Sequence, residues 1–252
     1  MAAAPSTGSS PSALHRPAAL PRALCLPRPE RLALVAVDMD GTFLRPDSTF
    51  DRPRLAMLRR RMREDGVRFV VASGNQEAQL LGFFENEEDG AFIRATQPAD
   101  MRDCLAFYLP RYETVGTASD LTGRRIDKGS IVQREGVDPA LVEELVSALE
   151  GAMVPVTSGH DCVDVIMPGR HKAFGLGVLL EHWGLAWEQV AAFGDSANDV
   201  EMLEAAGTGV AMAGSSEPAL AAADAVAPDN AEDGVLAVLE HWFADQAAPA
   251  RP

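Results

Sequence analysis

Short apolar runs that end in a glycine or a polar residue recur along most of the chain. Several of them are nearly continuous, as strands buried on both faces of a parallel sheet should be. Stretches with apolar residues at helical spacing separate these runs, so strands and helices alternate. This alternation predicts a doubly wound, Rossmann-like α/β core with strands at 32–37, 67–72, 189–193, 209–212 and 225–227.

The middle of the chain has a different pattern. A helix predicted to start after Asp138 is followed by two strand-like runs at 154–157 and 162–167, whereas 116–129 has the composition of a loop. Such a mixture predicts an α+β cap, inserted between the two halves of the core. The predicted domains are a discontinuous core at 31–84 and 169–245 and a cap at 85–168.

Residues 1–30 are rich in Ala, Pro and Ser and contain no acidic residue before Glu30. A segment of this composition cannot bury a core, so we expect a disordered tail. Its Arg16, Arg22 and Arg28 also fit an organellar transit peptide, although the many prolines disfavour an amphipathic helix. We therefore expect a cytoplasmic protein with a floppy tail, and a plastid or mitochondrial location is the alternative.

Composition narrows the classes of partner. The chain has 252 residues, 47% of them hydrophobic, and no apolar run approaches membrane-spanning length. Its net charge of −15 argues against nucleic acid and against an anionic membrane surface. Cys25, Cys104 and Cys162 lack the spacing of a metal site or a disulfide framework, so we expect free thiols in a reducing compartment.

Candidate chemistry lies where the predicted strands end. The first strand runs into Asp38-Met39-Asp40-Gly41-Thr42, in which two carboxylates stand two residues apart. On an extended backbone such residues project to one side, so Asp38 and Asp40 would share a site that needs a cation or a proton between them. The alternative is an acidic turn, because Asp-Gly is a common turn dipeptide.

Three later strand ends carry groups suited to a phosphate or a hard cation. Ser73-Gly74 follows the second core strand, Lys172 follows the last cap strand, and Asp195 and Asp199 follow the next core strand. Each has a plain structural explanation: a helix N-cap, a surface lysine, and acids in a first helical turn. Their ordered occurrence makes the functional explanation the better one.

This order of motifs resembles the haloacid dehalogenase-like phosphatase superfamily. The stretch Val71-Ala72-Ser73-Gly74-Asn75-Gln76 and the long gap before Lys172 are similar to its Cof-type sugar-phosphate phosphatases. The resemblance covers roughly residues 30–245. It implies a phosphatase that acts on small phosphorylated metabolites, foremost sugar phosphates. A phosphotransferase or mutase of the same superfamily, or a non-catalytic descendant, is the alternative.

The resemblance also implies a metal site. Asp38, the backbone carbonyl of Asp40, and Asp195 would hold Mg²⁺, with Asn198 and Asp199 in supporting positions. Oxygen donors without a His or Cys cluster fit a hard cation of this kind.

By the same resemblance, Asp38 would attack phosphorus and form an aspartyl phosphate. Asp40 would first protonate the leaving alcohol and then take a proton from water. Ser73, Gly74 and Lys172 would bind the phosphoryl oxygens.

The chain departs from this family after the helix predicted at 77–84. Another core strand and a sizeable cap should follow, but an acidic run at 85–89 comes at once. We therefore expect either a reduced cap or a lost segment. In the remaining cap, His160 lies in the turn between the two strand-like runs and is a candidate for substrate choice. A solvent-facing turn is the alternative.

Overall fold

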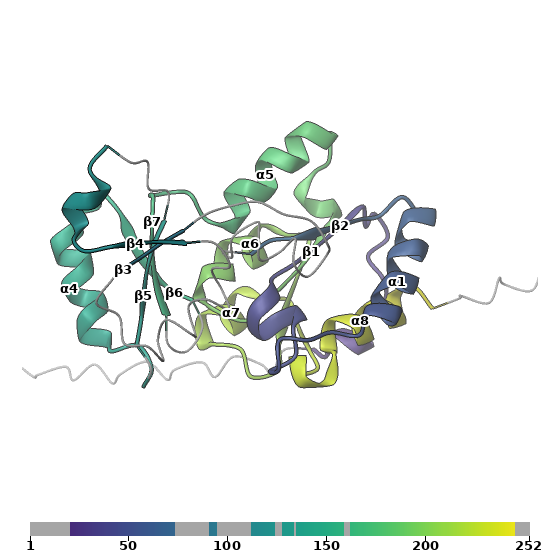
Figure 1. Cartoon of the computed structure of the whole chain (residues 1–252). Helices are drawn as coiled ribbons and strands as arrows, with labels where there is room; N and C mark the ends of the chain where they lie inside the picture. Colours follow the sequence, from purple (N-terminus) through teal and green to yellow (C-terminus); the bar gives the residue numbers. More distant parts are fainter. Residues whose placement is uncertain are drawn as a thin grey trace, which may run out of the picture.

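The computed structural model describes residues 21–73, 91–94, 112–123, 128–133, 135–158 and 162–244. Its centre is a five-stranded parallel sheet in the order β10-β9-β8-β1-β2 (Figure 1). The strands are β1 (Leu34–Val37), β2 (Arg68–Val71), β8 (Val190–Gly194), β9 (Thr208–Met212) and β10 (Ala225–Ala227). The predicted α/β core is confirmed.

Helices cover both faces of this sheet. The helices are α1 (Arg52–Glu64), α5 (Lys172–Trp183), α6 (Val200–Ala205), α7 (Glu217–Ala222) and α8 (Gly234–Trp242). One apolar cluster joins Val35 and Phe193 to α1 and α8, and a second joins Leu34 and Ala36 to α5, α6 and α7. Every residue of β1 and β8 is buried, because a central parallel strand meets helices on both sides.

The register of the sheet brings three strand ends to one level. Val37, the last residue of β1, pairs with Val71 of β2 on one side and with Phe193 of β8 on the other. The three strands are parallel, so the residues that follow them leave the sheet at the same edge. This edge is where ligands bind in open α/β sheets.

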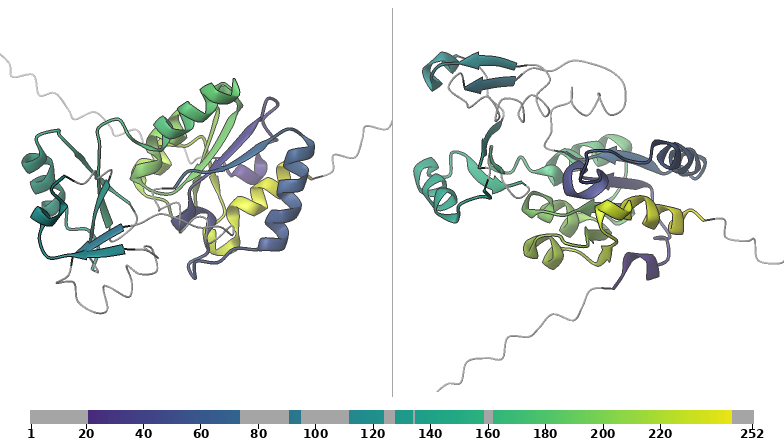
Figure 2. Two further views of the ribbon diagram at one scale, coloured as in Figure 1. Left: turned by 45° about the horizontal axis from the view of Figure 1, so that its top comes forward. Right: turned by 60° about the horizontal axis from the view of Figure 1, so that its bottom comes forward.

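The cap contains a three-stranded antiparallel sheet in the order β5-β7-β6. The strands of this sheet are β5 (Lys128–Val132), β6 (Val154–Thr157) and β7 (Cys162–Ile166), and the helix α4 (Pro139–Leu149) lies between β5 and β6 in sequence. Helix α4 lies on the side of this sheet that faces away from the core (Figures 1 and 2). A separate parallel pair is formed by β3 (Ala91–Arg94) and β4 (Tyr112–Val115).

Three strands of the middle region, β3, β4 and β5, were not expected from the sequence pattern. Residues 128–129 fall in the predicted loop, because Lys128, Gly129 and Ser130 give β5 too little apolar character for a strand signal. Pairing with β7 along its whole length decides its conformation. The helix predicted at 77–84 lies outside the described residues.

The free edge of the core sheet bears on the expected loss of a strand. Among the described residues no strand pairs with the outer side of β2, and β3 pairs with β4 instead of joining the core sheet.

None of the helices in the described parts is long and apolar enough to span a membrane.

Residues 21–30 pack against the core. Arg22 forms a parallel bridge with Val226 of β10, and Ala23, in the short helix η1 (Ala23–Cys25), has 0% exposure. The indole Nε1 of Trp242 in α8 donates to the Leu26 carbonyl at 3.2 Å. Figure 2 shows this purple segment beside the yellow α8. The prediction of a disordered tail is therefore wrong for residues 21–30, whereas residues 1–20 lie outside the described residues.

We expect Ala23→Asp to lower the free energy of unfolding by roughly 3 kcal/mol, because it buries an unpaired carboxylate. Leu24→Asp is the matched control, since the neighbouring Leu24 is 39% exposed. Urea unfolding of both variants measures the difference. Equal stability of the two variants would show that the packing of this segment does not contribute to the free energy of unfolding.

Candidate active site

Three side chains predicted from the sequence follow the aligned strand ends. Asp38 follows β1, Asp195 follows β8, and Ser73 stands two residues after β2. The backbone N–H of Asp38 donates to the Phe193 carbonyl at 3.0 Å, which extends the strand pairing to the residue that carries the carboxylate. The sheet itself therefore fixes the position of Asp38.

Asp38, Asp195 and Asp199 form a cluster of carboxylates. One oxygen from each lies within 4.8 Å of the others. Asp38 is 5% exposed and Asp199 is 0% exposed, so bulk water does little to screen their repulsion. The arrangement needs positive charge from another source.

Asp199 is held rigidly by the turn after β8. One of its oxygens accepts from the backbone N–H groups of Asp195 and Ser196 at 3.0 and 3.1 Å. Gly194 makes this approach possible, because a Cβ at that position would stand 2.5 Å from the Cβ of Asp199. Asn198 lies in the same turn and accepts a hydrogen bond from the Ser196 hydroxyl at 2.7 Å.

The chain turns sharply after Asp38, in a single turn over Met39–Phe43. The extended geometry expected for Asp38 and Asp40 therefore does not persist, and Asp40 lies outside the three-carboxylate cluster. It is still close enough to help raise the pKa of Asp195. Gly41 has φ +75°, and a Cβ there would stand 2.5 Å from an Asp195 oxygen.

Thr42 connects this turn to the cluster. Its hydroxyl donates to Asp195 at 2.8 Å, and the side chain is 1% exposed. Beyond the turn, the Asn230 amide donates to the Leu44 carbonyl at 2.6 Å, and Arg45 pairs with Asp233 at 2.6 Å. The Thr42 hydroxyl thus anchors the turn from within, and the contacts of Leu44 and Arg45 anchor the chain directly after the turn.

Lys172 supplies the cationic side chain at the cluster. It is the first residue of α5, whose N-cap His171 accepts from the backbone N–H of Phe174 at 3.2 Å. The Lys172 ammonium lies 2.6 Å from an Asp38 oxygen and 2.5 Å from an Asp199 oxygen. It therefore bridges the ends of two strands.

One ammonium does not balance three carboxylates, two of them buried. Burial raises the pKa of Asp38 to about 8, against the lowering effect of Lys172 and with a further rise from Asp199. Burial also raises the pKa of Asp195 to about 6, and Asp199 adds to the rise. Burial alone would lower the pKa of Lys172, but Asp38 and Asp199 outweigh it and raise that pKa.

The donor set fits a hard divalent cation. The cluster offers only oxygen ligands, is largely buried, and carries excess negative charge that a cation would neutralise. Asp38, Asp195 and Asp199 are the side chains able to hold it.

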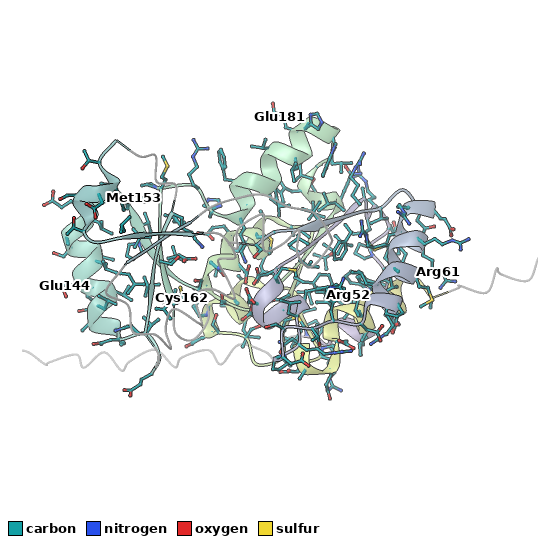
Figure 3. The ribbon with its side chains drawn as sticks, viewed as in Figure 1. Arg52, Arg61, Glu144, Met153, Cys162 and Glu181 are labelled. Atoms are coloured by element: carbon teal, nitrogen blue, oxygen red, sulfur yellow. The ribbon has the colours of Figure 1, made fainter. Side chains whose placement is uncertain are left out.

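A cavity of about 430 Å³ extends from this site to the cap. Ser73, Lys172 and Asn198 line its core end, and Lys128 and Asp164 are among the residues at its cap end. Figure 3 shows the side chains of both parts, with Cys162 labelled in the cap and Glu181 labelled in α5 of the core. Two predicted site residues, Gly74 and His160, lie outside the described residues.

Three residues in or near the site were not identified from the sequence. Thr42 belongs to the Asp-Gly-Thr stretch, where a hydroxyl beside two acids was the available signal. Lys128 and Asp164 gave no usable signal, because their strands are far apart in sequence and meet only through the cap sheet.

Comparison with known proteins places the chain in a family. The family model of haloacid dehalogenase-like hydrolases matches residues 35–97 and 89–239. The chain therefore belongs to the haloacid dehalogenase-like hydrolases. The predicted superfamily is confirmed.

Similar proteins indicate which kind of hydrolase this chain is. An Escherichia coli 5-amino-6-(5-phospho-D-ribitylamino)uracil phosphatase is 32% identical over 258 positions, which cover 83% of this chain and 95% of that protein. An E. coli pyridoxal phosphate phosphatase is 45% identical over 78 positions, 31% of this chain and 29% of that protein. A solved structure from Streptococcus mutans has a TM-score of 0.77 at 25% identity and covers 84% of this chain and 99% of that one. The prediction of a phosphatase is confirmed.

The alignment also bears on the length of the chain. It spans 258 positions, whereas 83% of this chain is about 209 residues. About 50 positions of the E. coli protein therefore have no counterpart here. A reduced cap or a lost segment after residue 84 stays a prediction.

We expect Gly41→Ala to reduce phosphatase activity by about 100-fold or more, because the new Cβ displaces the Asp195 carboxylate. Gly66→Ala is the matched control, since Gly66 has φ +73° and no atom within 4 Å of the added carbon. Both variants should lose roughly 1 kcal/mol of stability from backbone strain. Steady-state assays beside thermal melts separate the effects, and equal activity of the two variants would contradict this role of Gly41.

The raised pKa values of Asp38 and Asp195 predict how pH affects the metal-free protein. Both groups hold protons when folded at pH values where the unfolded chain, with pKa 3.8, has released them. Their stabilising contribution is full below about pH 4 and is lost as pH rises through about 6 and 8.

The melting temperature in EDTA should therefore fall between pH 5 and pH 8.5. An added divalent cation should remove most of this fall, because it stabilises the ionised carboxylates. A metal-free melting temperature that rises with pH would contradict the electrostatic account of the cluster.

Proposed function

We propose that this protein is a Mg²⁺-dependent phosphatase that hydrolyses phosphate monoesters of small metabolites through an aspartyl-phosphate intermediate. The observation that carries the proposal is the contact of Lys172 with Asp38 inside a buried carboxylate cluster. Ser73 lines the cavity that opens from this cluster. A nucleophile, a cation and a phosphate-binding hydroxyl are thereby available to one phosphoryl group.

The first step is a displacement at phosphorus. An Asp38 oxygen attacks, the bond from phosphorus to the leaving oxygen breaks, and Asp40 donates a proton to that oxygen. Lys172, Ser73 and the Gly74 amide stabilise the negative charge on the other phosphoryl oxygens.

The second step releases phosphate. Asp40, now ionised, accepts a proton from a water molecule that attacks the same phosphorus atom. The bond to Asp38 breaks, and the carboxylate and the acid are restored. This exchange explains why Asp40 belongs beside the cluster and not inside it, because it must gain and lose a proton in each cycle.

Mg²⁺ would be held by Asp38, Asp195 and the Asp40 carbonyl, with Asp199 and Asn198 in support. When bound, it neutralises developing charge on the phosphoryl group. A cation at this place would lower the pKa of Asp38, so that its carboxylate would be ionised and able to attack at neutral pH.

The substrate is a small phosphorylated metabolite, as the names of the similar phosphatases indicate. Sugar phosphates, expected from the sequence, stay a prediction. The division into a core at 31–84 and 169–245 and a cap at 85–168 is likewise part of this proposal. The cap would cover the leaving group, of which the core residues would reach only the oxygen that Asp40 protonates.

We expect Asp38→Asn to lower turnover by at least about 1,000-fold, because an amide cannot form the phosphoryl ester. Asp47→Asn is the control, since Asp47 is exposed and lies on a nearby loop. Phosphate release from p-nitrophenyl phosphate without an added acceptor measures hydrolysis directly. A tenth of the wild-type rate in a pure Asp38→Asn sample would refute the nucleophile assignment.

Activity should vanish in EDTA and return with Mg²⁺. Ca²⁺ should restore it poorly, because its larger and more variable coordination does not impose the octahedral geometry of Mg²⁺. Recovery is followed in the same assay after metal removal. Full activity in metal-free buffer would show that Lys172 alone neutralises the site.

A further inference from the structure

The cap end of the cavity is one face of the antiparallel sheet. Side chains alternate along a strand, so Asp164 and Ile166 of β7 point to the same side. Asp164 pairs in register with Val156 of β6, and Ile166 with Lys128 of β5. All four residues line the cavity, together with Val154.

A charged pair is set into this face. Asp164 is 6% exposed, and its carboxylate accepts from the Lys128 ammonium at 3.1 Å and from the Ser130 hydroxyl at 2.6 Å. The mechanism makes no use of this pair. Its position gives the cavity one hydrogen-bond acceptor and one donor side by side at the end away from Lys172.

The surface around the pair is aliphatic. Val154 is 38% exposed and Met167 is 44% exposed, although both are large apolar residues, and both line the cavity. Val156 and Ile166 complete the wall. Uncovered apolar side chains inside a cavity favour a ligand with an apolar face.

These features distinguish two kinds of leaving group. A polyol would press several hydroxyls against aliphatic side chains, and each hydroxyl buried without a partner is unfavourable. A flat heteroaromatic ring covers such a wall with its face and keeps its polar atoms at its edge. Besides Lys172, two basic residues, Lys128 and Arg170, and two acidic residues, Asp164 and Glu201, line the cavity, so their charges balance and do not call for a second anionic group.

We infer that Lys128 and Asp164 form a specificity site that recognises the polar edge of a heteroaromatic ring in the leaving group. The ring packs on Val154, Val156 and Ile166, Lys128 donates to an acceptor on its edge, and Asp164 accepts from a donor. The substrates are phosphate monoesters that carry such a ring. This inference rests on the proposed phosphatase function.

Three substrates test the site, because all are phosphate esters of a CH₂–OH group. Pyridoxine 5′-phosphate has a ring with polar edge atoms, benzyl phosphate has a ring without them, and glucose 6-phosphate is a polyol. The wild-type protein should have its highest kcat/KM with pyridoxine 5′-phosphate. A preference for glucose 6-phosphate would overturn the inference.

Lys128→Met and Asp164→Asn test the residues. We expect each to lower kcat/KM for pyridoxine 5′-phosphate by roughly 10–100-fold, and by at least about tenfold more than for benzyl phosphate. Arg170→Met is the control, since Arg170 also lines the cavity but its guanidinium lies over the Phe174 ring, 4.1 Å from the centroid. Equal losses on all substrates, or the same selective loss in Arg170→Met, would overturn the inference.

A binding measurement keeps this test separate from the proposed function. If wild-type protein releases phosphate from none of the three compounds, the phosphatase proposal fails. Calorimetric titration with pyridoxine 5′-phosphate then still tests the site, and its affinity must fall about tenfold or more in Lys128→Met. Lys128→Gln replaces that variant if it does not fold, and unchanged affinity in the folded variant would refute the assignment.

Discussion

The repulsion among Asp38, Asp195 and Asp199 is the constraint on which the rest of the structure depends. Three carboxylates stay together away from water only where rigid backbone holds them and positive charge meets them. The parallel register of β1 and β8 supplies the first requirement, and Lys172 supplies part of the second. The negative charge that Lys172 does not balance suits the site to a divalent cation.

The same constraint explains why the chain returns to the core through Lys172. This residue begins α5 shortly after the cap, so its ammonium reaches Asp38 only when the chain re-enters beside β1. The cap is thereby tied to the catalytic edge at one end. In the proposed mechanism a cap held at that place would cover the leaving group, while the core residues would act on the phosphoryl group and on the leaving oxygen. Phosphoryl chemistry and substrate choice would then lie on different parts of the chain.

In the cap and in the N-terminal segment, contacts with neighbouring elements fix the conformation of stretches whose own composition does not favour it. Strand β5 has a Lys-Gly-Ser start, yet pairing with β7 fixes it and sets Lys128 beside Asp164. The segment at 21–30 contains three prolines and two arginines, but Ala23 and Leu26 pack at β10 and α8. In both places partners distant in sequence decide a conformation that local composition does not favour.

The sequence by itself determined the α/β core, the family and the position of each acidic strand end, because buried parallel strands and glycine-bounded helices leave strong local patterns. Only the tertiary structure decided which carboxylates meet. Asp40 follows Asp38 by two residues but leaves the cluster through the turn at Gly41, whereas Asp199, assigned a supporting place, lies within it. Lys128 and Asp164 are 36 residues apart and meet through strand pairing. Local signals carry propensity and burial, but the convergence of distant side chains depends on register, which no local pattern contains.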